Sequence, residues 1–469
     1  MKSQLLPTIW LFMLISFQLG SQSDPYLTDY YPASPVPDRI MLTLTEDPAH
    51  SMAVNWRTSR AVGRGFVQIA VADPGPDLID SIFQVYPATT EAFLSDRNGA
   101  NYHSVIMDNL DPATQYSYRV GDSLHWSEWI HFTTAPLEPQ PLSFLYFGDA
   151  QNNIKSMWSR CIRGAYAKMP EANFLLHAGD LINRPNRDVE WGEWFYAGGW
   201  IYSTIPSIAT PGNHEYGRNA QGERELSRHW RPTFTFPMNG PEGLEETVYY
   251  VDYQDTRVIS LNTSTFNRSP ADSVKQVTWL REVLKNNPNR WTIVTMHYPI
   301  YSTKYGRDNK RLRDGLQPIF EKMGVDLVLQ GHDHAYGRGS NLPLGDGKRN
   351  TIGGPIYVVS VSGPKMYDQS LEEWMQRSAS NTQLYQLITI DGDQLHFKAY
   401  TVTGELYDAF ELRKQKKGRN LFLDQAPTDV EERLGLPKSF RDRYTEEDWS
   451  DFEGRFEAYM ARKKAREEK

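Results

Sequence analysis

The sequence contains one cysteine, Cys161, among its 469 residues, so no disulfide bond can form within the chain. Cys161 lies in a segment with an amphipathic pattern, which favours a small core residue over a reactive thiol. The chain also lacks a Gly-x-Ser-x-Gly motif. These absences exclude a scaffold built on internal disulfides and give no sign of a serine or cysteine nucleophile.

An excess of positive charge is absent as well. The chain has 50 Lys and Arg against 58 Asp and Glu, which gives a net charge of -8 at pH 7. This acidic balance provides no electrostatic reason to expect nucleic acid as the main partner. The hydrophobic fraction of 39% is typical of a soluble globular protein and argues against a membrane protein or a disordered chain. The length exceeds that of one ordinary core, so we expect two domains.

No apolar run is long enough for a confident membrane span. The stretch from Leu5 to Leu19 is mostly apolar, but it is short and interrupted by Gln and Ser. With Lys2 before it and Ser21-Gln-Ser23 after it, residues 1–23 are typical of a secretory signal peptide that is cleaved before Asp24. The alternative is a retained N-terminal anchor. We therefore expect a secreted or periplasmic protein with no transmembrane span.

Alternating strands and turns characterise residues 24–136. Met52, Val54 and Trp56 recur at every second position, as expected for a strand of an antiparallel sandwich. The segment Leu110-Asp-Pro112-Ala-Thr-Gln-Tyr116 resembles the tyrosine corner of fibronectin type III-like domains. The sequence thus predicts an all-β sandwich of the fibronectin type III-like kind in this region.

A different pattern follows the Pro-rich linker at residues 137–141. Over residues 142–412 apolar runs alternate with helical patterns, which indicates a layered α/β domain. Ser269 followed by Pro270 predicts the start of a helix. Apolar runs after residue 355 predict further, antiparallel strands.

Residues 413–469 form a charged C-terminal extension. Thr445 and Asp448 have the spacing of a capping box, which predicts a helix that begins there. Aromatic side chains at spacings of three and four form one stripe on this amphipathic helix. The stripe favours a helix docked on the body of the protein, with a partner or a membrane surface as the alternative.

Five short polar motifs each follow an apolar run in the α/β region. Because these runs are expected strands, the motifs fall at carboxyl ends, where open α/β sheets place their sites. Their oxygen and nitrogen side chains suit Zn, Mn or Fe better than a soft thiolate site would. Each motif alone is weak evidence, but all five in order predict one site. The motifs are Gly148-Asp149, Gly179-Asp180, Gly212-Asn213-His214-Glu215, Met296-His297 and Gly331-His332-Asp333-His334.

The order of these motifs resembles the calcineurin-like metallophosphoesterase superfamily. The sandwich in front and the run Gly331-His-Asp-His-Ala-Tyr336 make the chain similar to the purple acid phosphatases. This resemblance covers roughly residues 35–412 and implies a four-layer α/β/β/α domain behind the sandwich. It also implies two metal ions, Fe, Zn or Mn, as cofactors, and it is compatible with a homodimer.

The resemblance further assigns roles to residues of this sequence. His214, next to Asn213, matches the family histidine that contacts phosphate or the leaving oxygen, although it could instead orient Asn213. Asp180 is expected to bridge the two ions. The ligands implied for the first ion are Asp149, Asp180 and His334, and those that complete the second are Asn213, His297 and His332.

Two positions depart from the purple acid phosphatase pattern. Asn183 stands where those enzymes have a tyrosine ligand, so the charge transfer that colours them is not expected. Asn183 could ligate weakly or hold a water. Gln151 stands where they commonly have glycine, and it could be an extra oxygen ligand, a substrate contact or a structural residue. Other residues near the motifs could line the pocket or simply pack, namely Tyr298, Tyr301, Tyr305, Tyr336 and Arg338.

The function implied is hydrolysis of a small phosphate monoester, with hydroxide supplied by a metal-activated water and His214 as the candidate proton donor. Two alternatives remain open. One is a phosphodiesterase acting on nucleotide or lipid head-group esters, since the tyrosine ligand is missing. The other is a non-catalytic surface-binding protein with a vestigial metal site.

Overall fold

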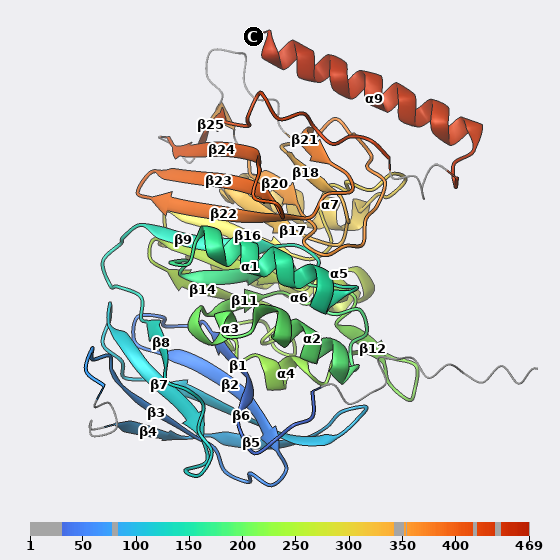
Figure 1. Cartoon of the computed structure of the whole chain (residues 1–469). Coiled ribbons are helices and arrows are strands. Elements are labelled where there is room, and N and C mark those ends of the chain that lie inside the picture. The colour runs from blue at the N-terminus through green and yellow to red at the C-terminus, as the bar shows by residue number, and fades with distance from the viewer. Residues whose placement is uncertain are drawn as a thin grey trace, which may run out of the picture.

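The computed structural model describes residues 31–76, 83–341, 351–352, 354–415, 420–436 and 442–468. The signal peptide predicted at residues 1–23 lies outside these ranges. Figure 1 shows the N-terminal sandwich at one end, the α/β region in the middle and a long helix at the other end.

The N-terminal region is the predicted antiparallel sandwich. Its outer sheet has the order β4-β3-β7-β8. Its other strands pair in the order β1-β2-β6-β5. The tyrosine corner is present, because the Asp111 backbone N–H donates a 2.8 Å hydrogen bond to the Tyr116 hydroxyl. The strands are β1 (Asp38–Thr43), β2 (Met52–Ser59), β3 (Phe66–Val71), β4 (Gln84–Pro87), β5 (Thr89–Leu94), β6 (Gly99–Met107), β7 (Gln115–Gly121) and β8 (Ile130–Thr133).

The first sheet of the α/β region continues the sandwich instead of standing apart from it. Strand β1 pairs in parallel with β11 through Thr43 and Ser207, so one sheet of twelve strands runs from β19 to β5. Its order is β19-β25-β24-β23-β22-β9-β10-β11-β1-β2-β6-β5. The added strands are β9 (Leu142–Phe147), β10 (Phe174–His177), β11 (Ser207–Ala209), β19 (Thr351–Ile352), β22 (Leu384–Asp391), β23 (Gln394–Thr401), β24 (Leu406–Lys414) and β25 (Asn420–Asp424).

A second sheet of seven strands, in the order β14-β15-β16-β17-β20-β18-β21, packs against the first. Its strands are β14 (Tyr249–Tyr253), β15 (Thr256–Leu261), β16 (Trp291–Met296), β17 (Leu327–Gln330), β18 (Tyr336–Gly339), β20 (Ile356–Val359) and β21 (Met375–Ala379). Successive side chains along its strands point alternately into two cores. Ile293 and Leu327 belong to the core shared with the first sheet. Their neighbours Val294 and Val328 join the core beneath the helices.

Helices cover the outer faces of both sheets, which confirms the predicted four-layer α/β/β/α class. Side chains of α1 and α2 belong to the core of the first sheet. Those of α6 and α7 belong to the second core. The helices are a π-helical turn (Ile154–Trp158), α1 (Ser159–Lys168), α2 (Asp188–Gly198), α3 (Ile201–Thr204), α4 (Trp230–Thr233), α5 (Thr263–Arg268), α6 (Pro270–Lys285), α7 (Lys310–Lys322) and α9 (Glu446–Glu467). A small hairpin joins β12 (Tyr216–Arg218) to β13 (Arg224–Leu226).

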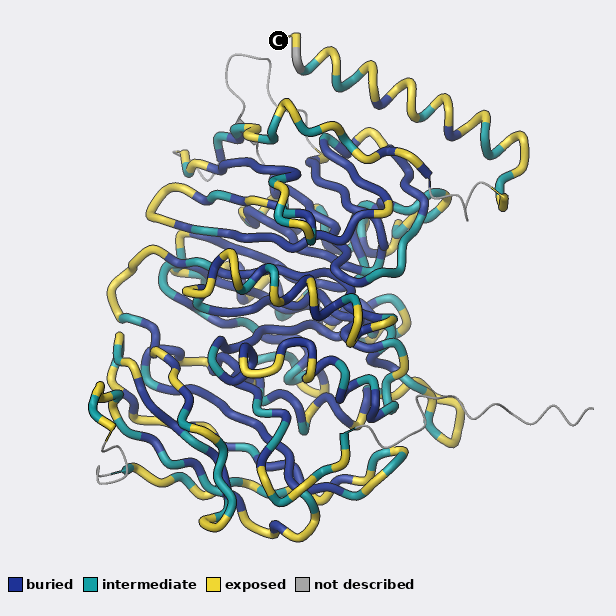
Figure 2. The backbone as a smooth tube through the Cα atoms, viewed as in Figure 1, coloured by how far each residue is buried: buried dark blue, intermediate teal, exposed yellow. Residues whose placement is uncertain are grey.

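Two predicted helix starts are confirmed. Ser269 caps α6, since its side chain accepts from the Asp272 backbone N–H. Thr445 and Asp448 form the expected capping box of α9. Phe452 and Tyr459 are buried against the body, so α9 docks on the protein, although much of its surface is exposed (Figure 2). None of the helices in the described ranges combines the length and the apolar character that a bilayer span requires.

Candidate metal centre

The five predicted motifs meet where the carboxyl ends of the central strands of both sheets come together. β9, β10 and β11 are parallel neighbours in the first sheet, and β16 and β17 are parallel neighbours in the second. Each is followed within three residues by its motif. The folding of these strands thus brings together side chains that are far apart in the sequence. The first and last predicted ligands, Asp149 and His334, are 185 positions apart (334 minus 149).

Asp180 lies at the middle of this set. Its Oδ2 is 3.1 Å from the Nε2 of His297 and 3.1 Å from the amide nitrogen of Gln151. Its Oδ1 accepts a 2.7 Å hydrogen bond from the backbone N–H of His214. Burial alone would raise the pKa of Asp180, but His297 and the other histidines outweigh it and hold the pKa well below its usual range. The carboxylate is therefore ionised, and it faces His297 on one side and Gln151 on the other.

Around Asp180 the other ligand candidates form two groups. Asp149 Oδ2 lies 3.1 Å from His334 Nε2. On the other side, His297 Nε2 is 3.2 Å from Asn213 Oδ1 and 3.2 Å from His332 Nδ1. Donor atoms of Asp180, His297 and His332 all lie within 4.8 Å of one another.

Backbone carbonyls fix how the histidines face the centre. His297 Nδ1 lies 2.8 Å from the carbonyl of Ala178, and His334 Nδ1 lies 2.8 Å from the carbonyl of Lys365. A carbonyl only accepts, so each Nδ1 carries a proton and each Nε2 is the nitrogen that faces the centre. This orientation leaves Nε2 as the nitrogen that would bind a metal ion once its own proton is released.

Two of the candidate ligands have left-handed backbone conformations. Asp180 has a φ of 52° and His332 a φ of 70°. Such values are uncommon outside glycine and cluster at functional sites. The left-handed turn at His332, after Gly331, directs the His332 ring away from the His334 ring. The two rings therefore diverge from one loop, as expected. A Cβ at Gly331 would collide with the Asp149 carboxylate, so only glycine fits there.

Gln151 is buried where the first group meets Asp180. Its Nε2 lies 3.1 Å from His334 Nε2 as well as from Asp180, and 3.5 Å from Asp149 Oδ2. Its Oε1 is buried with no partner among the described residues. A half-turn of the amide would direct that oxygen at the same three groups. The carboxylate, imidazole and amide donors therefore fit a pair of Zn, Mn or Fe ions.

His214 lies at the edge of the centre. Its Nδ1 donates a 2.6 Å hydrogen bond to the Asn183 carbonyl, and its Nε2 is 4.0 Å from Asp180 Oδ2. The side chain is 25% exposed, so it faces both the ligands and the solvent. Asn183 thus contributes its backbone to the site, and no described contact links its side chain to the ligands.

Sequence reasoning gave no role to Glu215, although it belongs to one of the motifs. Its carboxylate accepts hydrogen bonds from the backbone N–H groups of Asp180, Leu181 and Gly212, at 2.8, 2.8 and 2.6 Å. It is fully buried, and burial followed by the charge of Asp180 raises its pKa. Glu215 ties together two of the ligand-bearing loops. Its only signal in the sequence is its position directly after the Asn-His pair.

Asp333 is a second unassigned motif residue. It is buried between the two motif histidines and accepts from the Ser302 hydroxyl at 2.5 Å and the Thr303 backbone at 2.8 Å. It also pairs with Arg307. Asp333 thereby anchors the histidine loop to the segment after β16.

Only one of the five residues that the sequence offered as pocket lining or packing contacts a ligand candidate in the described structure. The ring of Tyr298 lies 3.9 Å from that of His332. Tyr336 and Arg338 are buried and bind Asp408 instead. Tyr301 stacks on Trp374, and Tyr305 donates to Asp451 of α9.

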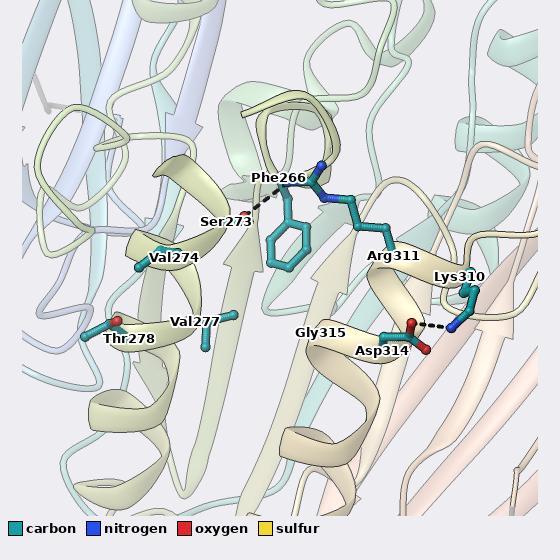
Figure 3. A pocket seen from close by; sticks show the side chains of 9 residues that line it. All are labelled: Phe266, Ser273, Val274, Val277, Thr278, Lys310, Arg311, Asp314 and Gly315. Atoms are coloured by element: carbon teal, nitrogen blue, oxygen red, sulfur yellow. Dashed lines mark hydrogen bonds and ion pairs between the residues drawn. The ribbon is translucent and has the colours of Figure 1, made fainter. Parts of the chain in front are cut away.

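Three large surface grooves in the described part of the structure lie outside the ligand set, and the largest of them, of about 990 Å³, is beneath α9. One, of about 730 Å³, runs between α6 and α7 (Figure 3). Lys310 pairs with Asp314 there, and Arg311 donates to Ser273. It contains no predicted site residue. A second groove, of about 750 Å³, is lined by Asn183 and by several cations of the loops near α1 and α2.

Comparison with protein families matches two consecutive regions of the chain. Residues 37–134 match the purple acid phosphatase N-terminal domain. Residues 142–336, which hold all six ligand candidates, match the calcineurin-like phosphoesterases.

Individual relatives agree with these matches. Acid phosphatase type 7 of Mus musculus is 29% identical over 363 residues, which cover 70% of this chain and 76% of that protein. Purple acid phosphatase 21 of Arabidopsis thaliana is 27% identical over 57% of this chain and 59% of that protein. The solved structure of a purple acid phosphatase from yellow lupin seeds has the same fold, with a TM-score of 0.67. It is 18% identical and covers 82% of this chain and 75% of its own.

Proposed function

Since the chain belongs to the calcineurin-like phosphoesterases, as a purple acid phosphatase-like member, we propose that it hydrolyses small phosphate monoesters at a centre of two metal ions. A metal-dependent phosphoric ester hydrolase agrees with the names of its relatives, which are acid phosphatases. To this assignment the proposal adds that the substrate is a monoester, that two ions are bound and which residues hold them.

The observation that carries the proposal is the position of Asp180. One oxygen of its carboxylate faces His297 at 3.1 Å on one side and Gln151 at 3.1 Å on the other. A carboxylate shared in this way is the usual bridge of a two-ion hydrolytic centre. Asp149 and His334 would complete the first ion's ligands with Asp180. Asn213, His297 and His332 would complete the second's.

Ions bound there supply Lewis-acid activation of water and offset charge on the phosphoryl oxygens. The protein's part is to hold the donors in place and to shield them from bulk solvent. Asp149, Asp180, His297 and His334 are all at most 1% exposed, so the donors lie in the interior of the protein.

His214 is the candidate for moving a proton to the leaving oxygen. Its Nδ1 hydrogen bond to the Asn183 carbonyl fixes the ring, and Nε2 lies at the edge of the centre, 4.0 Å from Asp180 Oδ2. A proton held on Nε2 could be given to the alcohol as the ester bond breaks.

Asn183 and Gln151 bear on the identity of the metal. An amide at residue 183 cannot supply a phenolate, so Zn or Mn would serve as well as Fe. The orphan oxygen of Gln151 supports this residue as the additional ligand of the first ion. Export through the predicted signal peptide and formation of a homodimer remain predictions from the sequence.

The test compares hydrolysis of p-nitrophenyl phosphate with that of bis-p-nitrophenyl phosphate, with Zn, Mn or Fe supplied in turn. We expect faster turnover of the monoester, and at least a thousandfold loss in the Asp180→Asn variant, on the order of what single catalytic groups contribute. Preference for the diester would move the assignment to a phosphodiesterase. If the wild-type protein and the Asp180→Asn variant hydrolysed the substrates at equal rates that do not depend on metal, the enzyme assignment would be contradicted.

A further inference from the structure

Resting on the proposed function, we propose that the substrate carries a second phosphate group, and that Lys304, Arg307 and Lys365 bind it. These three cations surround the ring of Tyr367 at one side of the metal centre. We call them, with Tyr367, the Tyr367 cluster. Substrates of this class are bisphosphorylated alcohols, of which one ester is hydrolysed while the other phosphate is held.

The Tyr367 cluster is compact. Lys304 Nζ lies 4.9 Å from the centre of the Tyr367 ring, Lys365 Nζ 5.5 Å and Arg307 Cζ 5.6 Å. All four side chains are half-buried, so each is ordered by packing yet open to solvent. Contact with the ring partly offsets the mutual repulsion of three positive charges.

The charge of the cluster is largely uncompensated. Arg307 pairs with Asp333 through one of its amino groups. Neither Lys304 nor Lys365 has a carboxylate within 4.0 Å among the residues that the structure describes. The nearby Asp368 accepts from the Tyr444 hydroxyl instead. Two ammonium groups and the remaining guanidinium N–H groups are thus available to a dianion, which would form charge-assisted hydrogen bonds with them.

The cluster adjoins the first ion's candidate ligands directly. The Tyr367 ring is 4.5 Å from the His334 ring. The Lys365 carbonyl holds His334 Nδ1 at 2.8 Å, and the Tyr367 backbone N–H donates to the His334 carbonyl at 2.9 Å. A phosphate on the cluster would therefore lie beside a phosphoryl group at the metal centre, at a distance that a short alcohol can span.

The cation-lined groove beyond Asn183 is the competing location. It also holds Arg160 and Arg184, but it includes Glu190 and Glu193 as well. Its Arg163 already donates to the carbonyls of Ala197 and Tyr196. The two lysines of the Tyr367 cluster have no carboxylate partner in the described part of the chain, and the cluster contacts the ligand candidate His334, which is why we assign the second phosphate to it.

The test uses a series of α,ω-alkanediol bisphosphates of two to six carbons, each compared with the matching hydroxyalkyl monophosphate. Water cleaves one ester bond of the bisphosphate, which releases inorganic phosphate and leaves the hydroxyalkyl phosphate. Because this product is itself a substrate, initial rates are measured. We expect a KM about tenfold lower for the bisphosphate of the best-fitting length, as charge-assisted contacts of this kind supply.

The Lys304→Gln/Lys365→Gln double variant is expected to lose this preference and to keep its kcat and KM for the monophosphates. The backbone carbonyl of Lys365 that holds His334 is retained in it. The matched control is Arg160→Gln/Arg184→Gln, which should keep the preference.

Each other outcome has a distinct meaning. If wild-type protein hydrolyses the monophosphates with no preference for any bisphosphate, the second phosphate subsite is refuted while the proposed function stands. If the arginine pair, and not the lysine pair, abolishes the preference, the assignment to the Tyr367 cluster is wrong. If wild-type protein hydrolyses neither class with any of the three metals, the proposed function itself fails.

Discussion

Glu215 illustrates how a residue that is not a ligand candidate can define the site. Its two oxygens accept three backbone N–H groups from the loops that carry Asp180 and Asn213. The left-handed conformation of Asp180 is one that the chain adopts only under such constraint. The ligand geometry thus depends on a neighbouring carboxylate.

The Glu215→Gln variant tests this dependence. A glutamine has one acceptor oxygen, so at least one buried backbone N–H loses its partner, at a cost of about 1–3 kcal/mol. We expect a lower melting temperature and metal retention reduced by about 10–100-fold, measured by elemental analysis after dialysis. Glu282, an exposed residue of α6, provides the control as Glu282→Gln. Unchanged metal retention in Glu215→Gln would refute the positioning role.

Asn183 gives a spectroscopic prediction. Since no tyrosine stands at this position, iron-loaded wild-type protein should lack a visible phenolate-to-iron band. The Asn183→Tyr variant loaded with iron should gain one, because the Asn183 backbone already lies next to His214 and the ligand set. A strong visible band in the wild-type protein would show that another tyrosine ligates, and Tyr298 would be the first to examine.

The ligand candidates could be proposed from the sequence because each stands in a short polar motif that follows an apolar strand. Glu215 and Asp333 stand in the same motifs, but their roles depend on backbone N–H groups of other loops, which no local pattern reveals. For Tyr336 and Arg338 the sequence left pocket lining and packing open, and the structure shows packing. They follow His334 closely, yet the strand β18 directs them to Asp408, 72 and 70 residues away in the chain.

At the scale of single elements, α9 is a peripheral helix that contacts the body along one side. Phe452 is 7% exposed, while Phe456, one turn further along the same stripe, is 37% exposed. The Tyr459 hydroxyl donates to Glu432, and Arg462 donates to the Leu371 carbonyl. The predicted docking is confirmed, and it rests on one side of the helix.

We expect Phe452→Ala to loosen α9 without unfolding the rest. Removing a buried phenylalanine costs about 3–5 kcal/mol, so the helix should open more often although Tyr459 and the polar contacts of α9 remain. Limited trypsin digestion should cut faster after Arg462 and Lys463, while metal content stays unchanged. Phe456→Ala is the matched control and should digest at the wild-type rate. Equal digestion of both variants would show that Phe452 does not anchor the helix.

Strand β1 and helix α2 are joined by a buried ion pair. Arg39 donates two hydrogen bonds to the Asp188 carboxylate, at 2.7 and 2.9 Å, and His229 Nε2 lies 3.1 Å from the same group. Burial would raise the pKa of Asp188, but His229, Arg39 and Arg57 outweigh it and hold the pKa well below its usual range. The pair links the sandwich to the α/β region. Its partners are 149 residues apart, so the sequence gave no indication of it.

The Asp188→Asn variant should be destabilised by about 3–5 kcal/mol, because Arg39 is left buried without its countercharge. The pKa of Asp188 is lower in the folded state, so the stabilisation is present above about pH 4 and is lost as the pH falls. Thermal melts from pH 7 down to pH 3 should show a smaller acid effect in the variant than in wild type. Asp314→Asn is the control, since Asp314 and its partner Lys310 are both exposed and their pair is worth about 1 kcal/mol or less. A melting temperature for Asp188→Asn equal to that of the control would contradict this role.

For the whole molecule, the sequence predicted the class of each region but not the join between them. The change from strand patterns to mixed patterns near residue 140 suggested two separate units. The pairing of Thr43 with Ser207 instead makes one sheet of the two. A single residue pair leaves no periodic pattern, so it could not be read from composition or alternation.

We expect the described regions to unfold as one unit. The shared sheet and the Arg39–Asp188 pair couple the sandwich to the α/β core, so calorimetry should give one transition for the metal-loaded protein. Two resolved transitions, one of them unaffected by metal removal, would show that the sandwich is an independent domain.

The parallel join of β1 to β11 also has a consequence for synthesis. On the ribosome, Thr43 emerges 164 residues before Ser207, the residue with which it pairs (207 minus 43). At about 5–20 residues per second, the nascent sandwich waits roughly ten to thirty seconds with that edge of β1 uncovered. An uncovered strand edge is a template for pairing with other chains. The newly made N-terminal region is therefore the part of this protein most in need of a chaperone.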